Sequence, residues 1–192
     1  MEPKYISTAT VNLQGFRFQQ NNTIANYGTS TRERNWAFLD MQNLYKEVSK
    51  RNWKINWKIF RQYLEKKYNV TKAIGFLGYM KENEHVYQFL KRAGFILEFR
   101  MVNRLKNGEV KGNVDVDLVA YALNNINDYN KAIIIADDCD YCGIINNLKM
   151  QNKLSLIISS HSKNKTSNLI KRIASEFILS IDSIRHIIEY KK

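Results

Sequence analysis

The sequence predicts an α/β domain in which a mainly parallel, five-stranded sheet is covered by helices on both faces. Two patterns indicate this fold class. Short apolar runs rich in β-branched and aromatic residues recur from residue 36 onward, and stretches with apolar residues at helical spacing separate them. The chain has 192 residues, of which 44% are hydrophobic, so its length suits one core of ordinary size.

The five expected strands are short and apolar, as is typical of strands buried on both faces. Four stretches between them, and a fifth near the C-terminus at residues 180–190, are expected to be helices. Gly94 is expected to end the second helix, because glycine readily adopts a left-handed backbone. The strands are expected at residues 36–39, 73–77, 95–99, 132–135 and 154–158. The helix faces toward the sheet are expected to carry Ile59, Phe60, Tyr63 and Leu64; Val86, Phe89, Leu90 and Ala93; Val116, Val119, Ala122, Leu123 and Ile126; and Ile144, Ile145 and Leu148.

Two regions differ in composition. Residues 1–34 are rich in Asn, Gln, Thr and Ser and show no regular period, so we expect a flexible or loosely docked N-terminal extension before a domain at 35–192. No apolar run is long enough to cross a bilayer, and the first residues lack the pattern of a secretory signal. The chain has only two cysteines, which favours a cytoplasmic location.

Charge is unevenly distributed along the chain. The formal net charge is +12, which favours a polyanionic partner such as nucleic acid. Residues 46–72 carry nine basic residues against two acidic ones, whereas residues 109–140 carry seven acidic residues against two basic ones. A basic protein that concentrates acids in one segment indicates a local use for them.

The positions of these acids relative to the expected strands indicate a metal site. Asp40 directly follows the first strand, Asp138 and Asp140 follow the fourth, and Asp115 and Asp117 begin the third helix. The carboxyl ends of parallel strands meet at one edge of a sheet, where ligands bind. Carboxylates packed there repel one another unless a cation neutralises them, and Mg²⁺ prefers such oxygen ligands.

The individual residues have alternative interpretations. Asp115 and Asp117 cannot share a helical face, so we expect only Asp115 to reach the metal. Asn43 is expected in the same loop as Asp40, from which its amide can orient a water, a phosphate or a carboxylate. Any single aspartate at a strand end or helix start is more often a helix cap, but the set of four favours a metal site.

Three segments resemble the signature segments of a known family, the NYN domains, in the LabA-like branch of the PIN-like nucleases. Their order, spacing and strand context agree with the family, and the resemblance runs from about residue 35 to the C-terminus. The segments are FLDMQNL at 38–44, KGNVDVDL at 111–118 and IADDCDYC at 135–142.

The resemblance implies a three-layer α/β/α PIN-like fold and a ribonuclease that uses Mg²⁺ or Mn²⁺ to hydrolyse RNA internally, leaving a 5′-phosphate and a 3′-hydroxyl. Carried over by position, the catalytic set is Asp40, Asn43, Asp115, Asp138 and Asp140, with the four aspartates as metal ligands.

The chain departs from the family pattern at two places. Ala136-Asp137 stands where relatives usually have Ser-Gly, and Tyr121 stands where many carry a further aspartate. The alternative to a ribonuclease is therefore a catalytically weakened NYN-like module that binds RNA or a protein.

Basic residues are expected to hold RNA, with single strands favoured, outside the acidic pocket. The candidates are Lys50, Arg51, Lys54, Lys58 and Lys111. Interleaved aromatic residues can stack on bases, although each is more often part of a core; they are Trp53, Trp57 and Tyr63. The sequence leaves homodimer formation open, and it shows no basic amphipathic helix of the membrane-binding kind.

The spacing of Cys139 and Cys142 is also that of a thioredoxin-like redox site. Asp138 and Asp140 oppose this interpretation because nearby negative charge disfavours a thiolate, and the chain has no proline after Pro3. We expect buried, inert thiols. A zinc site has less support, because no paired ligand spacing joins the cysteines to the histidines; these are His85, His161 and His186.

Overall fold

The computed structural model describes residues 33–100, 103–104, 110–111, 114–136, 138–161 and 166–191, with backbone alone for 103–104 and 110–111. Of the expected extension at 1–34, only Glu33 and Arg34 fall inside these ranges, so its character stays a prediction. The side chain of Lys111 and all of Asp137 also lie outside the described residues. No helix in the described part is both long and apolar enough to cross a membrane.

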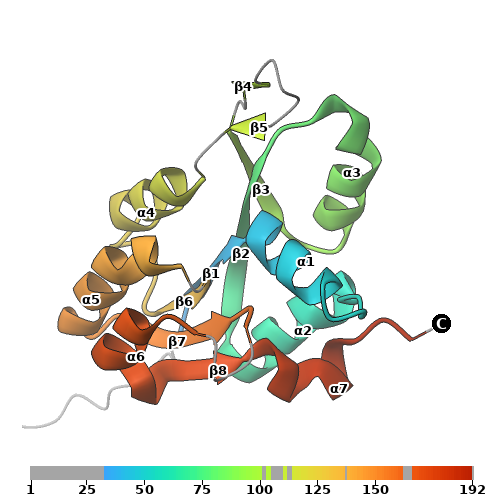
Figure 1. Cartoon of the computed structure of the whole chain (residues 1–192). Coiled ribbons are helices and arrows are strands. Elements are labelled where there is room, and N and C mark those ends of the chain that lie inside the picture. The colour runs from blue at the N-terminus through green and yellow to red at the C-terminus, as the bar shows by residue number, and fades with distance from the viewer. Residues whose placement is uncertain are drawn as a thin grey trace, which may run out of the picture. The chain divides into compact units, whose positions relative to one another are not determined.

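A six-stranded parallel sheet forms the centre of the domain, in the order β3-β2-β1-β6-β7-β8 (Figure 1). All five expected strands are present, which confirms the predicted mainly parallel sheet. The sixth strand is only three residues long, too short to give a recognisable apolar run. The strands are β1 (Asn35–Asp40), β2 (Val70–Gly78), β3 (Ile96–Arg100), β6 (Ala132–Ile135), β7 (Leu154–Ser159) and β8 (Ile178–Ser180), with a separate antiparallel pair β4 (Asn103–Arg104) and β5 (Val110–Lys111).

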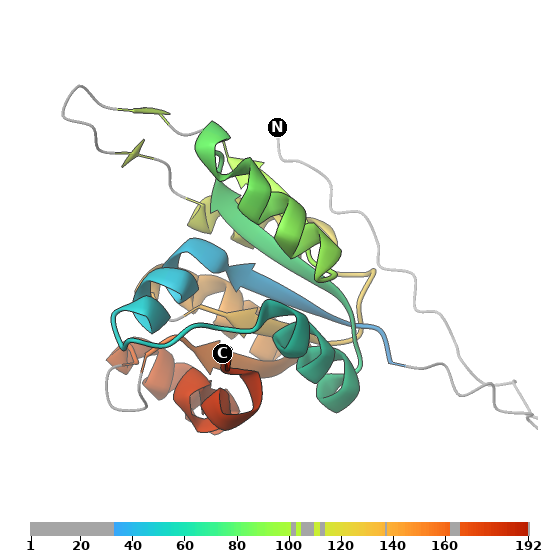
Figure 2. The same cartoon turned by 90° about the vertical axis from the view of Figure 1, so that its right-hand side faces the viewer.

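Helices cover both faces of the sheet, so the three-layer α/β/α prediction is confirmed. Figure 2 looks onto the layer that contains α1, α2, α3 and α7. The opposite face is covered by α4, α5 and α6. The helices are α1 (Met41–Ser49), α2 (Trp57–Tyr68), α3 (Glu84–Arg92), α4 (Asp115–Asn124), α5 (Cys142–Met150), α6 (Asn168–Ala174) and α7 (Arg185–Ile188), and 3₁₀ turns occupy Lys81–Asn83, Cys139–Tyr141, Ser175–Phe177 and Ile181–Ile184.

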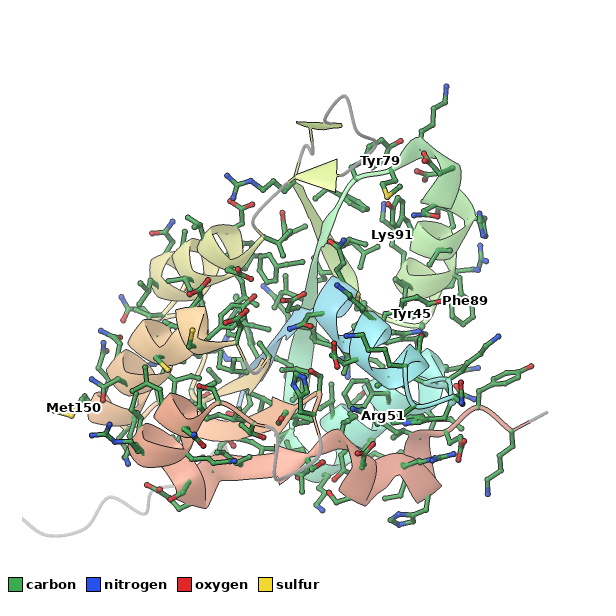
Figure 3. All side chains as sticks on the ribbon, viewed as in Figure 1. Tyr45, Arg51, Tyr79, Phe89, Lys91 and Met150 are labelled. Carbon is green, nitrogen blue, oxygen red and sulfur yellow. The ribbon has the colours of Figure 1, made fainter. Side chains whose placement is uncertain are left out.

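Two predicted helix faces are right only in part, since Leu90 and Ala122 are buried as predicted but other predicted residues are exposed. In α3 the buried residues are Tyr87 and Leu90, whereas Phe89 is 47% exposed and points away from the sheet (Figure 3). In α4 the residues Leu118 and Ala122 are buried, whereas Val116 is 59% exposed. Both segments are apolar on more than one side, so spacing alone did not decide which side meets the sheet. The predicted faces of α2 and α5 are buried, except that Ile59 is partly exposed.

The predicted end of the second helix is confirmed, whereas the predicted C-terminal helix differs from expectation. Gly94 lies directly after Ala93, the C-cap of α3, and its φ of +95° confirms it as the helix-ending residue. The expected C-terminal helix at 180–190 is instead a 3₁₀ turn followed by the one-turn helix α7. Its residues Ile181, Ile184 and Ile188 are buried, whereas Ile187 is exposed. The helix α1, which was not predicted, begins directly after β1 and therefore contains Asn43.

The strand β1 is buried along its whole length and fixes the position of the candidate site. Trp36 and Phe38 pack toward α4 and α5, whereas Ala37 and Leu39 pack toward α1 and α2. Full burial of a side chain such as Phe38 stabilises the fold by about 1.5–3 kcal/mol. The last residue of this anchored strand is Asp40.

Candidate metal centre

Asp40 lies at the junction of β1 and α1 and is only 5% exposed. Its Oδ1 atom accepts a hydrogen bond of 2.9 Å from the backbone N–H of Asn43, so Asp40 caps the N-terminus of α1. The helix-cap interpretation is thus correct for Asp40, and it leaves the Oδ2 atom available for a second partner. The expectation that Asn43 lies in a loop is wrong, because capping begins the helix at Met41.

Tyr141 joins Asp40 to Asp115. Its hydroxyl donates to Asp40 Oδ2 at 3.0 Å and also contacts Asp115 Oδ1, while its ring is fully buried. Burial and the two carboxylates raise the pKa of Tyr141 far above its usual value, so the phenol stays neutral. A single hydroxyl therefore holds together two carboxylates that are remote in sequence.

Asp138 and Asp140 lie in the turn between β6 and α5. One ligand atom from each of Asp138, Cys139 and Asp140 lies within 4.8 Å of the others, and all three residues are exposed. The same turn contains Tyr141, whose backbone N–H donates to the Asp138 carbonyl at 3.2 Å. The exposed pair and the buried phenol thus belong to one short segment.

The parallel sheet explains why these segments meet. The strands β1 and β6 are hydrogen-bonded neighbours, with Leu39 opposite Ile135. The carboxyl end of β1 provides Asp40, and the segment that follows the carboxyl end of β6 provides Asp138, Asp140 and Tyr141. Tyr141 then reaches Asp115 at the start of α4.

Asp117 points to a different partner. Its Oδ2 atom lies 3.2 Å from Nη1 of Arg100, at the end of β3. Asp115, in contrast, contacts Tyr141 beside Asp40. The two residues are separated as their spacing predicts, and Asp115 is the one beside Asp40.

The two cysteines differ in exposure. Cys139 is exposed and Cys142 is buried, so the expectation that both thiols are buried is wrong for Cys139. A hydrogen bond and the charge of Asp138 raise the pKa of Cys139, and burial raises the pKa of Cys142. Both thiols are therefore disfavoured as thiolates, which argues against a redox site. Among the described residues, the group of side chains that could hold a metal ion is Asp138, Cys139 and Asp140, and it contains no histidine. It therefore gives no support to a zinc site built from cysteines and histidines.

The predicted RNA-binding residues divide into two groups. Arg51 is tied to the domain, because Nη2 donates to the Ser160 carbonyl at 2.6 Å and Nε lies 3.2 Å from Asp182 (Figure 3). Lys50 is exposed and pairs with Glu47 at 2.5 Å. Lys54 and Lys58 are exposed, and neither side chain makes a hydrogen bond or ion pair within the described ranges.

The aromatic residues of the basic segment belong to the core. Trp53 and Tyr63 are buried, and the ring of Trp57 packs edge-on against Phe95 with 5.8 Å between ring centroids. None of these three rings is a free platform for base stacking.

Of the residues that depart from the family pattern, Tyr121 is half-buried and Ala136 is buried, and Asp137 lies outside the described residues. Tyr121 packs its ring against Phe38 and Phe76, at centroid distances of 6.5 and 5.6 Å, and supplies no carboxylate. Ala136 is buried at the end of β6.

Tyr141 is the site residue that sequence reasoning missed. It stands in the third resembling segment, directly after Asp140. The sequence did contain a signal for it. A purely apolar residue would suffice for packing at this position, but the chain has a tyrosine, whose hydroxyl can bond to the nearby acids.

A three-layer α/β/α domain with acids at the carboxyl ends of its parallel strands is the architecture of a PIN-like nuclease domain. The NYN domain family model matches residues 35–182, and the chain belongs to this family of PIN-like nucleases. NYN nucleases generally use divalent metal ions.

A solved structure supports the same fold. A crystal structure of a protein of unknown function from Vibrio parahaemolyticus superposes with a TM-score of 0.69 at 17% sequence identity. The match covers 85% of this chain and 100% of that chain. Comparison with curated proteins gives no match.

Proposed function

We propose that this protein is a metal-dependent ribonuclease that cleaves RNA internally. The observation that carries the proposal is the Tyr141 hydroxyl, which holds Asp40 and Asp115 together and belongs to the same short segment as the exposed Asp138 and Asp140. A nuclease of this type needs several carboxylates at one place, and family membership adds RNA as the expected substrate.

The donor set suits a hard divalent cation such as Mg²⁺ or Mn²⁺. Asp40, Asp115, Asp138 and Asp140 offer carboxylate oxygens, which are the ligands that these ions prefer. Cys139 is a poor ligand because Asp138 raises the pKa of its thiol. When bound, such an ion supplies charge neutralisation at the phosphate and lowers the pKa of a coordinated water.

The protein residues have distinct roles in this proposal. Asp138 and Asp140 are exposed, so their carboxylates are accessible to solvent and to a phosphodiester. Asp40 and Asp115 have a fixed geometry because Tyr141 and the N-terminus of α1 restrain them. We keep Asn43 as an orienting residue in the first turn of α1.

RNA binding is assigned to the exposed lysines. Lys54 lies just before α2, and Lys58 lies in its first turn. Both side chains are exposed, so their charges are free to contact phosphates. The Lys50 side chain is exposed and remains a candidate phosphate contact, although it pairs with the largely buried Glu47. Lys111, the preference for single strands, a homodimer and a cytoplasmic location stay predictions. Arg51 is removed from the RNA-binding set because its guanidinium has partners within the domain.

A catalytically weakened binding module is the second candidate. The observation that favours it is the ring of Tyr121, which occupies core space where many relatives carry a carboxylate. Such a protein would bind RNA without cutting it.

Cleavage of a single-stranded RNA by the full chain, with and without Mn²⁺, separates the two candidates. We expect metal-dependent cleavage that is lost in Asp138→Asn and retained in the control Asp128→Asn, which removes the same charge from an exposed position beyond α4. Equal cleavage by Asp138→Asn and wild type would refute the site. RNA binding without cleavage by the wild type would establish the module instead.

A further inference from the structure

A cavity lies beside the candidate metal centre, between α4 and the edge of the sheet. Its volume is about 420 Å³, within the range of small-molecule sites. Phe76 and Glu98 line it from β2 and β3, and Tyr121 and Asn124 line it from α4. Val114, which directly precedes Asp115, also lines it.

The cavity is adjacent to the candidate metal centre in the sheet as well as in sequence. Asp40 is the register partner of Phe76, and Phe76 is the register partner of Glu98. The cavity is therefore lined by residues of the first and second strands beside β1, at the level of Asp40. A nucleotide next to the scissile phosphate is the part of an RNA substrate that would reach it.

The lining combines aromatic surface with an available carboxylate. Glu98 is half-buried, and its side chain makes no hydrogen bond or ion pair within the described ranges. Its charge acts on the Tyr121 phenol, whose pKa is raised chiefly by burial and further by Glu98. Glu98 and Tyr121 thus face the same space from opposite walls. Arg100 and Asp117, which also line the cavity, are paired with each other.

An ionised glutamate offers hydrogen-bond acceptors only. It therefore recognises a group that presents two N–H donors side by side. Among the four RNA bases, guanine alone does so on its Watson–Crick edge, through N1–H and the N2 amino group. Adenine and cytosine place a ring acceptor beside their amino group, and uracil flanks its N–H with carbonyls. Unpaired bases are commonly read on this edge by RNA-binding proteins.

We infer that this cavity binds an unpaired guanine base of the RNA next to the cleavage position, with the Glu98 carboxylate accepting from guanine N1–H and N2–H and the Tyr121 ring forming one wall. This inference rests on the proposed RNA-cleaving function and adds a base preference to it.

The test uses the full chain carrying Asp138→Asn, so that binding is measured without cleavage. Fluorescence anisotropy compares labelled oligouridylates with one central guanosine, inosine or adenosine. Inosine lacks only the N2 amino group, so it isolates one of the two expected hydrogen bonds. We expect guanosine RNA to bind about tenfold more tightly than inosine or adenosine RNA. Adding Glu98→Gln should abolish this preference. The control Glu84→Gln, at an exposed position of α3, should keep it.

Failure of this inference is distinguishable from failure of the proposed function. Equal binding of the three RNAs, with metal-dependent cleavage by the wild type, would overturn the base pocket alone. Guanosine-selective binding that needs Glu98, without wild-type cleavage, would support the pocket and overturn the nuclease. A Glu98-dependent affinity for free guanosine monophosphate, without any preference among the RNAs, would assign the cavity to a free nucleotide and overturn the inference.

Discussion

Tyr141→Phe is the most informative single change at the candidate metal centre. It removes the hydroxyl that contacts Asp40 Oδ2 and Asp115 Oδ1 but keeps the buried ring. The packing of α5 against the sheet is therefore preserved, and the two carboxylates lose their shared partner.

The expected magnitude follows from the contacts that are lost. A hydrogen bond to a charged group contributes about 1.5–3 kcal/mol, and Asp40 is almost fully buried. We expect the metal-free variant to lose about 2 kcal/mol of unfolding free energy. Residues that orient metal ligands typically change metal affinity by 10–100-fold, so we expect Mn²⁺ to bind about tenfold more weakly.

The assay has two independent readouts. Urea unfolding of the metal-free protein measures stability, and the electron paramagnetic resonance signal of free Mn²⁺ measures affinity. Tyr129→Phe is the matched control, because its buried hydroxyl donates to the Ala122 carbonyl at 2.9 Å in the same core. We expect that variant to lose about 1 kcal/mol of stability and to keep the wild-type Mn²⁺ affinity.

Two results would refute this reasoning. Unchanged Mn²⁺ affinity in Tyr141→Phe would mean that the hydroxyl does not position the ligands. Tighter Mn²⁺ binding would mean that the hydroxyl competes with the cation for the carboxylates.

The remaining predictions concern RNA binding and the thiols. Lys54→Ala and Lys58→Ala should each weaken RNA binding and flatten the dependence of log affinity on log salt by about one unit or less, measured by anisotropy. Arg51→Met should instead lower the unfolding free energy by about 1–3 kcal/mol and leave the salt dependence unchanged; the reverse pattern would restore Arg51 to the RNA-binding set. Because Asp138 raises the pKa of Cys139, iodoacetamide should modify Cys139 slowly at pH 8 in metal-free protein, and Asp138→Asn should speed the reaction by lowering that pKa. Mass spectrometry of the alkylated peptide measures this, and equal rates would contradict the assigned cause.

The sheet and the approximate place of the site were predictable from the sequence. Parallel strands buried on both faces leave short apolar runs, and β1 and β6 were found in this way. The carboxyl ends of such strands share one edge, which is why Asp40 and Asp138 are expected at the same edge of the sheet. These features depend on local pattern and on one general rule of topology.

Features that depend on tertiary contacts were not predictable. The contacts of Tyr141 with Asp40 and Asp115 join segments far apart in sequence, and no local pattern encodes them. Arg51 has the same charge as its neighbouring lysines, so only its contacts with Ser160 and Asp182 identify it as structural. The predicted face of α4 was right only in part for a related reason: α4 is apolar on several sides, and the sheet buries Ala122 but leaves Val116 exposed.

Anomalous diffraction from crystals soaked in Mn²⁺ tests the central claim most directly. The account predicts one Mn²⁺ peak coordinated by oxygens from the Asp40–Asp115 pair and from the Asp138–Asp140 pair. A peak held by only one pair, or no peak near either pair, would contradict it.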